Sequence, residues 1–166
     1  RHLAHHDTLT DLPNRRLLED RLQHAIRHAH RKQQMLAVMF VDLDHFKAVN
    51  DRHGHVAGDR VLASLGGFLK RSLRENDVVS RCGGEEFAML VNATEPAAQA
   101  FFQRMLEEFS AFTHHDENGN PFLVTFTGGT AELKSGMTLE GWKLLADRAL
   151  YLGKRSGRKK IVSAAR

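Results

Sequence analysis

The stretch Arg81-Cys82-Gly83-Gly84-Glu85-Glu86-Phe87 decides the fold of this 166-residue chain. Two short runs with strand-like composition, residues 78–82 and 86–91, flank the glycine pair. Glycine adopts positive φ without a steric penalty, so a Gly-Gly pair between two such runs predicts a β-hairpin joined at Gly83-Gly84. The two acidic residues, Glu85 and Glu86, would then follow the turn directly.

A second pair of acids follows a buried strand. Residues 35–41 form a continuous apolar run between polar neighbours, which is typical of a central strand buried on both faces, and Asp42 and Asp44 come after it. If the hairpin pairs beside this strand, three or four carboxylates meet at one end of the sheet and require a cation. Mg²⁺ prefers such oxygen ligands and shares them with substrate phosphates. For Asp44 taken alone, a helix cap or a place in solvent is the favoured interpretation.

The rest of the chain predicts one α/β domain over residues 1–166: a sheet of mixed strand directions that contains a hairpin and is covered by helices. Either Asp11 or Asn14 would cap the first helix. Helices are predicted over residues 17–29, 44–50, 59–73, 96–109 and 139–154. Loops are predicted over residues 51–58 and 114–121, and further strands over residues 122–127 and 161–162.

Composition narrows the possible functions. The formal net charge is +4 and the pI is about 9.5, which suits an anionic ligand. No aromatic-basic stacking pattern accompanies the charge, so nucleic-acid binding is disfavoured. The single cysteine, Cys82, excludes an internal disulfide and fits a cytoplasmic setting. The longest apolar run, residues 35–41, is far too short to span a membrane. Because the chain begins with Arg1, we expect a piece of a larger, multidomain protein, and a membrane anchor elsewhere in that parent is compatible with this piece.

Together, several motifs resemble the GGDEF domains, the diguanylate cyclases, with glutamate in place of the aspartate of the family name. They are Asp7-x-Leu9-Thr10-x-Leu12-x-Asn14-Arg15, Asp42-Leu43-Asp44-His45-Phe46-Lys47, Asn50-Asp51, Gly54-His55, Gly58-Asp59, the stretch from Arg81 to Phe87, Ala146-Asp147-x-Ala149-Leu150-Tyr151-x-x-Lys154 and Gly157-Arg158. The resemblance implies a fold like that of nucleotidyl cyclases and polymerase palms, with a central, mostly antiparallel sheet of about five strands. It also implies condensation of two GTP into cyclic di-GMP with release of two pyrophosphates.

The resemblance implies roles for the acids at the hairpin. Asp42, the backbone carbonyl of Leu43 and Glu85 would hold Mg²⁺, with Mn²⁺ as a possible substitute. Glu85 would also accept the proton of the 3′-hydroxyl, and Glu86 would help with a second metal ion. Lys47 would face the phosphates and steady charge in the transition state.

The substrate would be bound by groups from three further segments. Asn50 and Asp59 would recognise guanine, whose N1–H and N2–H₂ donors a carboxylate can accept, and His55 would line the same pocket unless it is a surface histidine. Lys154 and Arg158, four residues apart, would bind the outer phosphates if the last helix extends that far. Gly83 and Gly84 would let the backbone approach the triphosphate.

A product-inhibition site is implied by Arg74-x-x-Asp77, five residues before the Gly-Gly pair. Arg74 would pair with phosphate or stack on guanine, and Asp77 would accept hydrogen bonds from a guanine edge. The sequence does not identify the distant basic residue that completes this site, and Arg104 is one candidate. The alternative for the pair is a surface salt bridge.

Since the product has two equivalent phosphodiester bonds, two domains must face each other as a homodimer, and a missing upstream regulatory region would control that pairing. The alternative function is a GGDEF module that senses GTP or cyclic di-GMP without turnover.

Two departures from the family pattern stand out. Residues 127–131, Thr-Gly-Gly-Thr-Ala, replace a more usual serine, apolar residue and single glycine, so we expect a looser strand. Gly153 replaces a more usual alanine, so we expect a less rigid end of the last helix.

Overall fold

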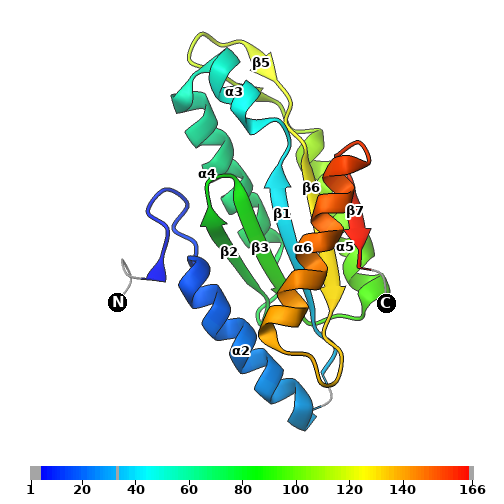
Figure 1. Cartoon of the computed structure of the whole chain (residues 1–166). Coiled ribbons are helices and arrows are strands. Elements are labelled where there is room, and N and C mark those ends of the chain that lie inside the picture. The colour runs from blue at the N-terminus through cyan, green and yellow to red at the C-terminus, as the bar shows by residue number, and fades with distance from the viewer. Residues whose placement is uncertain (1–4, 33, 165–166) are drawn as a thin grey trace.

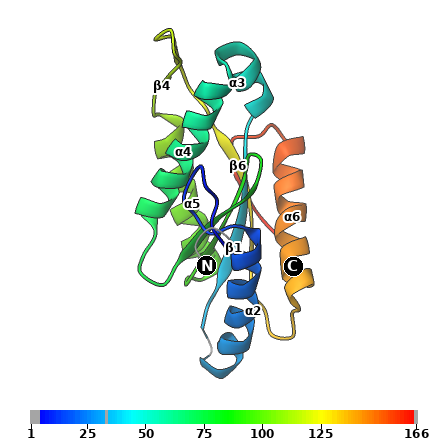
Figure 2. The same cartoon turned by 90° about the vertical axis from the view of Figure 1, so that its left-hand side faces the viewer.

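A five-stranded sheet with helices on both faces forms the molecule (Figure 1 and Figure 2). The computed structural model describes residues 5–32 and 34–164, so the predicted domain limits, residues 1 and 166, lie outside the described residues. The helices are α2 (Arg15–Lys32), α3 (Phe46–His53), α4 (His55–Ser72), α5 (Glu95–Ser110) and α6 (Leu139–Arg155). The strands are β1 (Ala37–Leu43), β2 (Val78–Gly83), β3 (Glu86–Val91), β4 (His114–His115), β5 (Pro121–Phe122), β6 (Phe126–Glu132) and β7 (Ile161–Ser163).

The sheet has the order β2-β3-β1-β6-β7 and is antiparallel except between β6 and β7. The predicted hairpin, the central strand, the edge strand and the mixed directions are therefore confirmed. The central strand begins at Ala37 and extends through Asp42 to Leu43, two residues beyond the predicted end. Met35, at the predicted start, is 53% exposed because it precedes the first paired residue of the sheet.

Side chains of the sheet alternate between two apolar cores. Met39 and Val41 belong to the core that includes residues of α4 and α5, whereas Val38 belongs to the core that includes residues of α2 and α6. Figure 2 shows these two pairs of helices on opposite faces of the sheet. Trp142 anchors the second core, since its buried indole N–H donates to the carbonyl of Ala131 at 2.9 Å. None of the helices within the described residues is long and apolar enough to cross a membrane.

The predicted loop over residues 51–58 is wrong. The α3 helix continues to His53, and α4 begins at His55, with Gly54 alone (φ +93°) making the turn. A glycine reaches this conformation without strain, so one residue is enough to reverse the chain between two helices. The polar composition that suggests a loop here belongs to exposed helical positions instead.

The predicted strand over residues 122–127 is also displaced. Residues 114–122 form the small hairpin of β4 and β5, and β6 starts only at Phe126. The hairpin is closed by Asp116, whose Oδ1 accepts backbone N–H groups of Asn118 and Asn120 at 2.9 Å each. At the start of α2, Asn14 is the capping residue, with its Oδ1 accepting the Leu17 N–H at 3.2 Å.

The glycines of β6 do not interrupt it, because β6 pairs with β1 along its whole length. At Gly129 a Cβ atom would lie 2.1 Å from the backbone nitrogen of Leu150 and 2.4 Å from the carbonyl oxygen of Ala146, both in α6. Gly153 likewise approaches Thr127, and α6 continues past it to Arg155. Both glycines thus permit close packing of α6 on β6, and the expected loosening of the strand is wrong.

Candidate active site

The hairpin turn lies beside the end of the central strand (Figure 1). Asp42 is paired in register with Glu86, and the Leu43 N–H donates to the Glu85 carbonyl at 3.2 Å. The turn has Gly84 and Glu85 between the strands, one residue later than predicted, because a β-bulge shifts the register after Arg81. Gly83 (φ +148°) and Gly84 (φ +49°) have open space where a Cβ atom would stand, so a ligand can approach this backbone closely.

Asp42 has one satisfied and one unsatisfied carboxylate oxygen. Its Oδ2 contacts the ammonium group of Lys154, which α6 brings to the sheet. Its Oδ1 is buried and has no hydrogen-bond partner among the residues that the structure describes. A buried anionic oxygen without a donor is costly, and a hard cation would satisfy it. The donor set of Asp42, Glu85 and a backbone carbonyl at Leu43 consists of oxygen only, which fits Mg²⁺.

Glu85 lies close enough to Asp42 for the two carboxylates to influence each other. Burial raises the pKa of Glu85 above its ordinary value, and the negative charge of Asp42 raises it further, while Lys154 acts in the opposite direction. A carboxylate with a raised pKa is a stronger proton acceptor than an exposed one. Asp42 and Glu85 thus form a two-carboxylate site, in which Asp42 has an oxygen without a donor in the described part of the chain and Glu85 is suited to take up a proton.

The predicted cluster of three or four carboxylates is reduced to these two. Asp44 accepts hydrogen bonds from Thr125 Oγ1 and Thr127 Oγ1, each at 2.6 Å, and from the Lys159 backbone N–H at 3.1 Å. It ties β6 and the segment after α6 to the start of α3 and makes no helix cap. Glu86 points to solvent beside Arg15, at 3.8 Å. Within residues 5–32 and 34–164, no group of three or more His, Cys, Asp or Glu side chains is placed to hold a metal ion.

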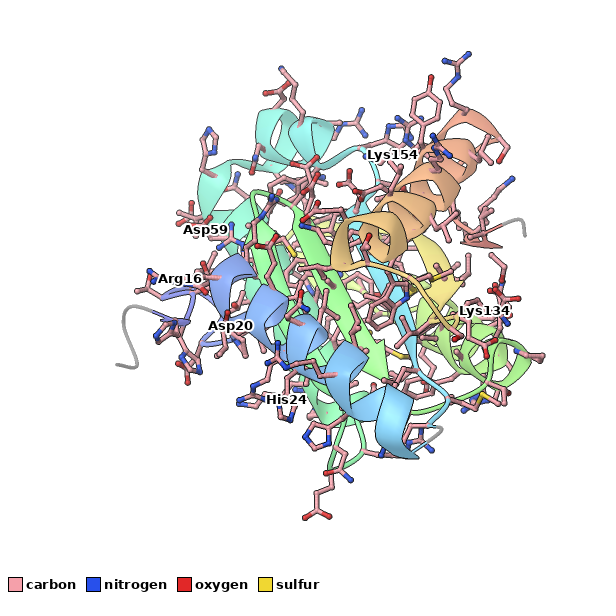
Figure 3. All side chains as sticks on the ribbon, turned by 60° about the horizontal axis from the view of Figure 1, so that its bottom comes forward. Arg16, Asp20, His24, Asp59, Lys134 and Lys154 are labelled. Atoms are coloured by element: carbon pink, nitrogen blue, oxygen red, sulfur yellow. The ribbon has the colours of Figure 1, made fainter. Side chains whose placement is uncertain are left out.

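The predicted guanine-binding residues come together at the corner between α3 and α4. Asn50 packs so closely on Gly58 that a Cβ atom there would lie 1.9 Å from Asn50 Oδ1. His55 and Asp59 project from the first turns of α4 and are exposed. Figure 3 shows Asp59 and Lys154 on either side of the end of the β2–β3 hairpin.

Of the predicted phosphate-binding residues, Lys47 lies on an exposed face of α3, and Arg158 lies outside the helix on which it was expected. Lys47 is exposed and pairs with Asp51 at 2.9 Å, one turn along α3. The α6 helix ends at Arg155, and Arg158 lies beyond it with φ +60°, so Lys154 and Arg158 do not share a helical face. The Arg158 guanidinium nevertheless lies next to Lys154, since it donates to the Lys154 carbonyl at 3.5 Å.

Arg74 and Asp77 form the predicted pair, but their surroundings differ. The Asp77 side chain is 1% exposed; its Oδ2 accepts from the Arg74 backbone N–H at 3.2 Å and its Oδ1 from the Asn92 N–H at 3.1 Å. The Arg74 side chain is 66% exposed and donates to the Asn92 carbonyl at 2.8 Å. Arg74 is thus accessible to a ligand, while Asp77 holds the backbone at the end of β3. Arg104 lies over the Phe101 ring on α5.

Arg81 and Asp7 support the hairpin turn, a role that the sequence did not predict. Arg81 Nη1 donates to both Asp7 oxygens at 3.0 and 3.1 Å, and its Nε and Nη2 donate to the Gly84 carbonyl at 3.0 and 2.8 Å. Burial acts to raise the pKa of Asp7, but hydrogen bonds from Thr10 and Arg81 outweigh it and hold the pKa below its usual value. Both residues occur in the quoted motifs, but 74 positions separate them, so no local pattern links them.

Comparison with known proteins agrees with this arrangement. Residues 4–160 match the family described as diguanylate cyclase, GGDEF domain. The diguanylate cyclase DgcP of Pseudomonas aeruginosa is 38% identical over 156 residues, which cover 93% of this chain and 23% of that protein. The chain therefore spans about a quarter of the length of that relative.

Solved structures show the same fold. The coiled coil and GGDEF domain of DgcB from Caulobacter crescentus, in complex with c-di-GMP, has a TM-score of 0.94 at 30% identity and covers 99% of this chain and 87% of that one. The active GGEEF domain of a diguanylate cyclase from Vibrio cholerae has a TM-score of 0.86 at 28% identity, covering 93% and 99%. The match over nearly the whole chain, the sheet order and the acids at the hairpin together place this chain in the GGDEF family of diguanylate cyclase domains.

Proposed function

We propose that this domain condenses two GTP molecules into cyclic di-GMP in a Mg²⁺-dependent reaction. The observation that carries the proposal is the Asp42–Glu85 pair beside an open glycine turn, with a buried Asp42 oxygen to which none of the described residues donates a hydrogen bond. Asp42, Glu85 and the Leu43 carbonyl would hold the metal ion, which supplies charge neutralisation at the phosphates and activation of the attacking oxygen.

Other residues of the chain bind the base and the phosphates of the substrate. Asn50, Asp59 and His55 bind guanine at the α3–α4 corner, while Lys154 and Arg158 bind the outer phosphates. Lys47 is 88% exposed, so its side chain is free to leave Asp51 and turn to the substrate. Glu86, exposed at the start of β3, would contribute to a second metal ion.

In the chemical step, the 3′-oxygen of one GTP attacks the α-phosphorus of the other. A new P–O bond forms, the bond between the α-phosphorus and the bridging oxygen breaks, and pyrophosphate leaves. Glu85 takes the hydroxyl proton. In a second step of the same kind, the 3′-oxygen of the second nucleotide attacks the α-phosphorus of the first, the bond from that phosphorus to its bridging oxygen breaks, and the ring closes as the second pyrophosphate leaves.

Two copies of the domain are required, because each site binds one GTP and the ring has two equivalent bonds. The DgcB structure contains a coiled coil together with its GGDEF domain. We infer that an upstream regulatory segment pairs the domains here as well, in the cytoplasm where GTP is available. Arg74 would take part in product inhibition by cyclic di-GMP, the compound bound in the DgcB structure.

The test is incubation with GTP and Mg²⁺ at high protein concentration, or with a fused dimerising segment, followed by detection of cyclic di-GMP. Product is expected from the wild type and none from Glu85→Ala. GTP binding without any product from the wild type would replace this proposal by the sensing module. Product formation by Glu85→Ala would remove the role of Glu85.

A further inference from the structure

The α3 helix is held near its start by Thr125 and by strand β6, and at its end by the β4–β5 hairpin. At its start, Asp44 accepts hydrogen bonds from Thr125 Oγ1 and Thr127 Oγ1. At its end, the last residue of the helix, His53, places Nδ1 2.8 Å from Asp116 Oδ2 in the β4–β5 hairpin. Figure 1 and Figure 2 both show this hairpin beside α3, at the end of the molecule that carries the guanine-binding corner.

The contact between His53 and Asp116 is largely buried, and the Asp116 carboxylate accepts several further hydrogen bonds. The side chains are 12% and 5% exposed. Besides His53, the Asp116 carboxylate accepts the backbone N–H groups of Asn118 and Asn120 and the Asn120 side-chain amide at 3.3 Å. The hydrogen bond from His53 is the main reason that the pKa of Asp116 is lowered to about 2, so this carboxylate is ionised at neutral pH. A buried carboxylate needs such donors, which makes the contact strongly directional.

Ring stacking adds a second constraint. The imidazole of His53 stacks on Phe122, with centroids 4.1 Å apart and an interplanar angle of 14°. His114 stacks on the same ring at 5.5 Å and meets Phe109 of α5 at 5.4 Å. The end of α3 is therefore connected through His114 and Phe122 of the β4–β5 hairpin to the apolar core beneath α5.

We propose that His53 and Asp116 are positioning residues for nucleotide binding: their contact holds the end of α3, with Asn50 and the Gly54 turn, in the orientation that binds guanine. This proposal rests on the proposed function of the α3–α4 corner. Asn50 lies one turn before His53 on α3, and its carbonyl accepts the Gly54 N–H at 2.9 Å. A rotation of this last turn would move Asn50 away from Gly58 and change its position relative to Asp59.

The test compares two variants with a matched control. His53→Phe removes the polar contact but retains a ring that can stack on Phe122, and Asp116→Asn removes the charge while retaining an oxygen for the hairpin. Glu117→Gln removes one exposed carboxylate from the same hairpin and serves as the control. Each protein is titrated with a non-hydrolysable GTP analogue and assayed for turnover of GTP and of ITP, which lacks the 2-amino group of guanine. Thermal unfolding is recorded in parallel.

We expect KM for GTP and the dissociation constant of the analogue to rise on the order of tenfold in both variants. The value of kcat should be nearly unchanged, because the contact positions the base and does not touch the reacting groups. The preference for GTP over ITP should shrink, and Glu117→Gln should match the wild type. If Asp116→Asn is too unstable to assay, His53→Phe alone decides the outcome. Wild-type affinity and preference in the folded variants would overturn this proposal only. A wild type that binds no GTP would overturn the proposed function and this proposal with it.

Discussion

Lys154 and Asp42 form an ion pair between the end of α6 and the end of the central strand, where Oδ1 of Asp42 has no donor within residues 5–32 and 34–164. The ammonium thus stands where the counter-charge of the acidic pair is needed. A divalent ion that binds Asp42 and Glu85 would take over this counter-charge and release Lys154 toward the phosphates of GTP. Metal binding and phosphate binding are linked in this arrangement.

The substitution Lys154→Met should make the unfolding free energy of the domain depend on Mg²⁺. In EDTA the variant leaves Asp42 unpaired and should lose about 1–3 kcal/mol of unfolding free energy. Millimolar Mg²⁺ should restore most of it, as measured by urea denaturation. The control is Lys143→Met, which removes an ion pair between another lysine of α6 and Glu19 of α2. Its stability should show no such recovery with Mg²⁺. An equal loss with and without Mg²⁺ would contradict metal binding at Asp42.

Substitution Gly58→Ala should weaken nucleotide binding without unfolding the domain. The new methyl group would displace the Asn50 side chain, while the helical backbone gains about 0.5–1 kcal/mol from loss of a glycine. We expect about tenfold weaker binding of a GTP analogue by calorimetry. Gly67→Ala in the same helix meets only the movable Arg71 guanidinium and should bind normally. Normal binding by Gly58→Ala would show that Asn50 does not contact guanine.

Substitutions of Arg74 and Asp77 should have different effects, because Arg74 would bind the ligand and Asp77 supports the backbone. Arg74→Ala should relieve inhibition by cyclic di-GMP and change stability by less than about 1 kcal/mol, since its side chain is exposed. Asp77→Ala should cost about 1–3 kcal/mol because it leaves the Asn92 N–H without its acceptor. Inhibition curves and urea denaturation measure the two effects. Unchanged inhibition of Arg74→Ala would exclude this residue from the inhibitory site.

Acid should selectively remove the contribution of Asp116 to stability. Its pKa is lowered from 3.8 to about 2 in the folded protein, chiefly by the hydrogen bond from His53, so its charge stabilises the fold above pH 3.8. The difference in unfolding free energy between wild type and Asp116→Asn should be constant at higher pH and shrink as the pH falls from 3.8 to about 2. Denaturation curves recorded across this range test it; a difference independent of pH would contradict an ionised Asp116.

Local patterns in the sequence were sufficient for the hairpin and the central strand. A Gly-Gly pair between two apolar runs and one continuous apolar run each indicate their structure without knowledge of any distant residue. Once those elements pair, Asp42 and Glu85 must be neighbours, so this part of the site was predictable as well.

Contacts between distant residues were not predictable. Asp44 bonds to Thr125 and Thr127, Asp7 to Arg81, and His53 to Asp116, and none of these pairs leaves a periodic signal. The same limit explains the wrong loop over residues 51–58. Polar composition favours a loop, but the packing of Asn50 on Gly58 stabilises a helical corner that propensity alone does not reveal.

Gly129 determines how closely α6 packs on β6. It has no functional group, yet its hydrogen atom in place of a side chain lets the backbone of α6 lie directly on β6, and Lys154 is one turn beyond the contact at Leu150. Any larger residue would push the helix outward and carry the ammonium away from Asp42. On the proposed function, random mutagenesis followed by selection for loss of cyclic di-GMP synthesis would therefore recover substitutions at Gly129 together with those at the charged residues. On the proposed function, the site thus depends on Gly129, a residue with no side chain that could bind substrate.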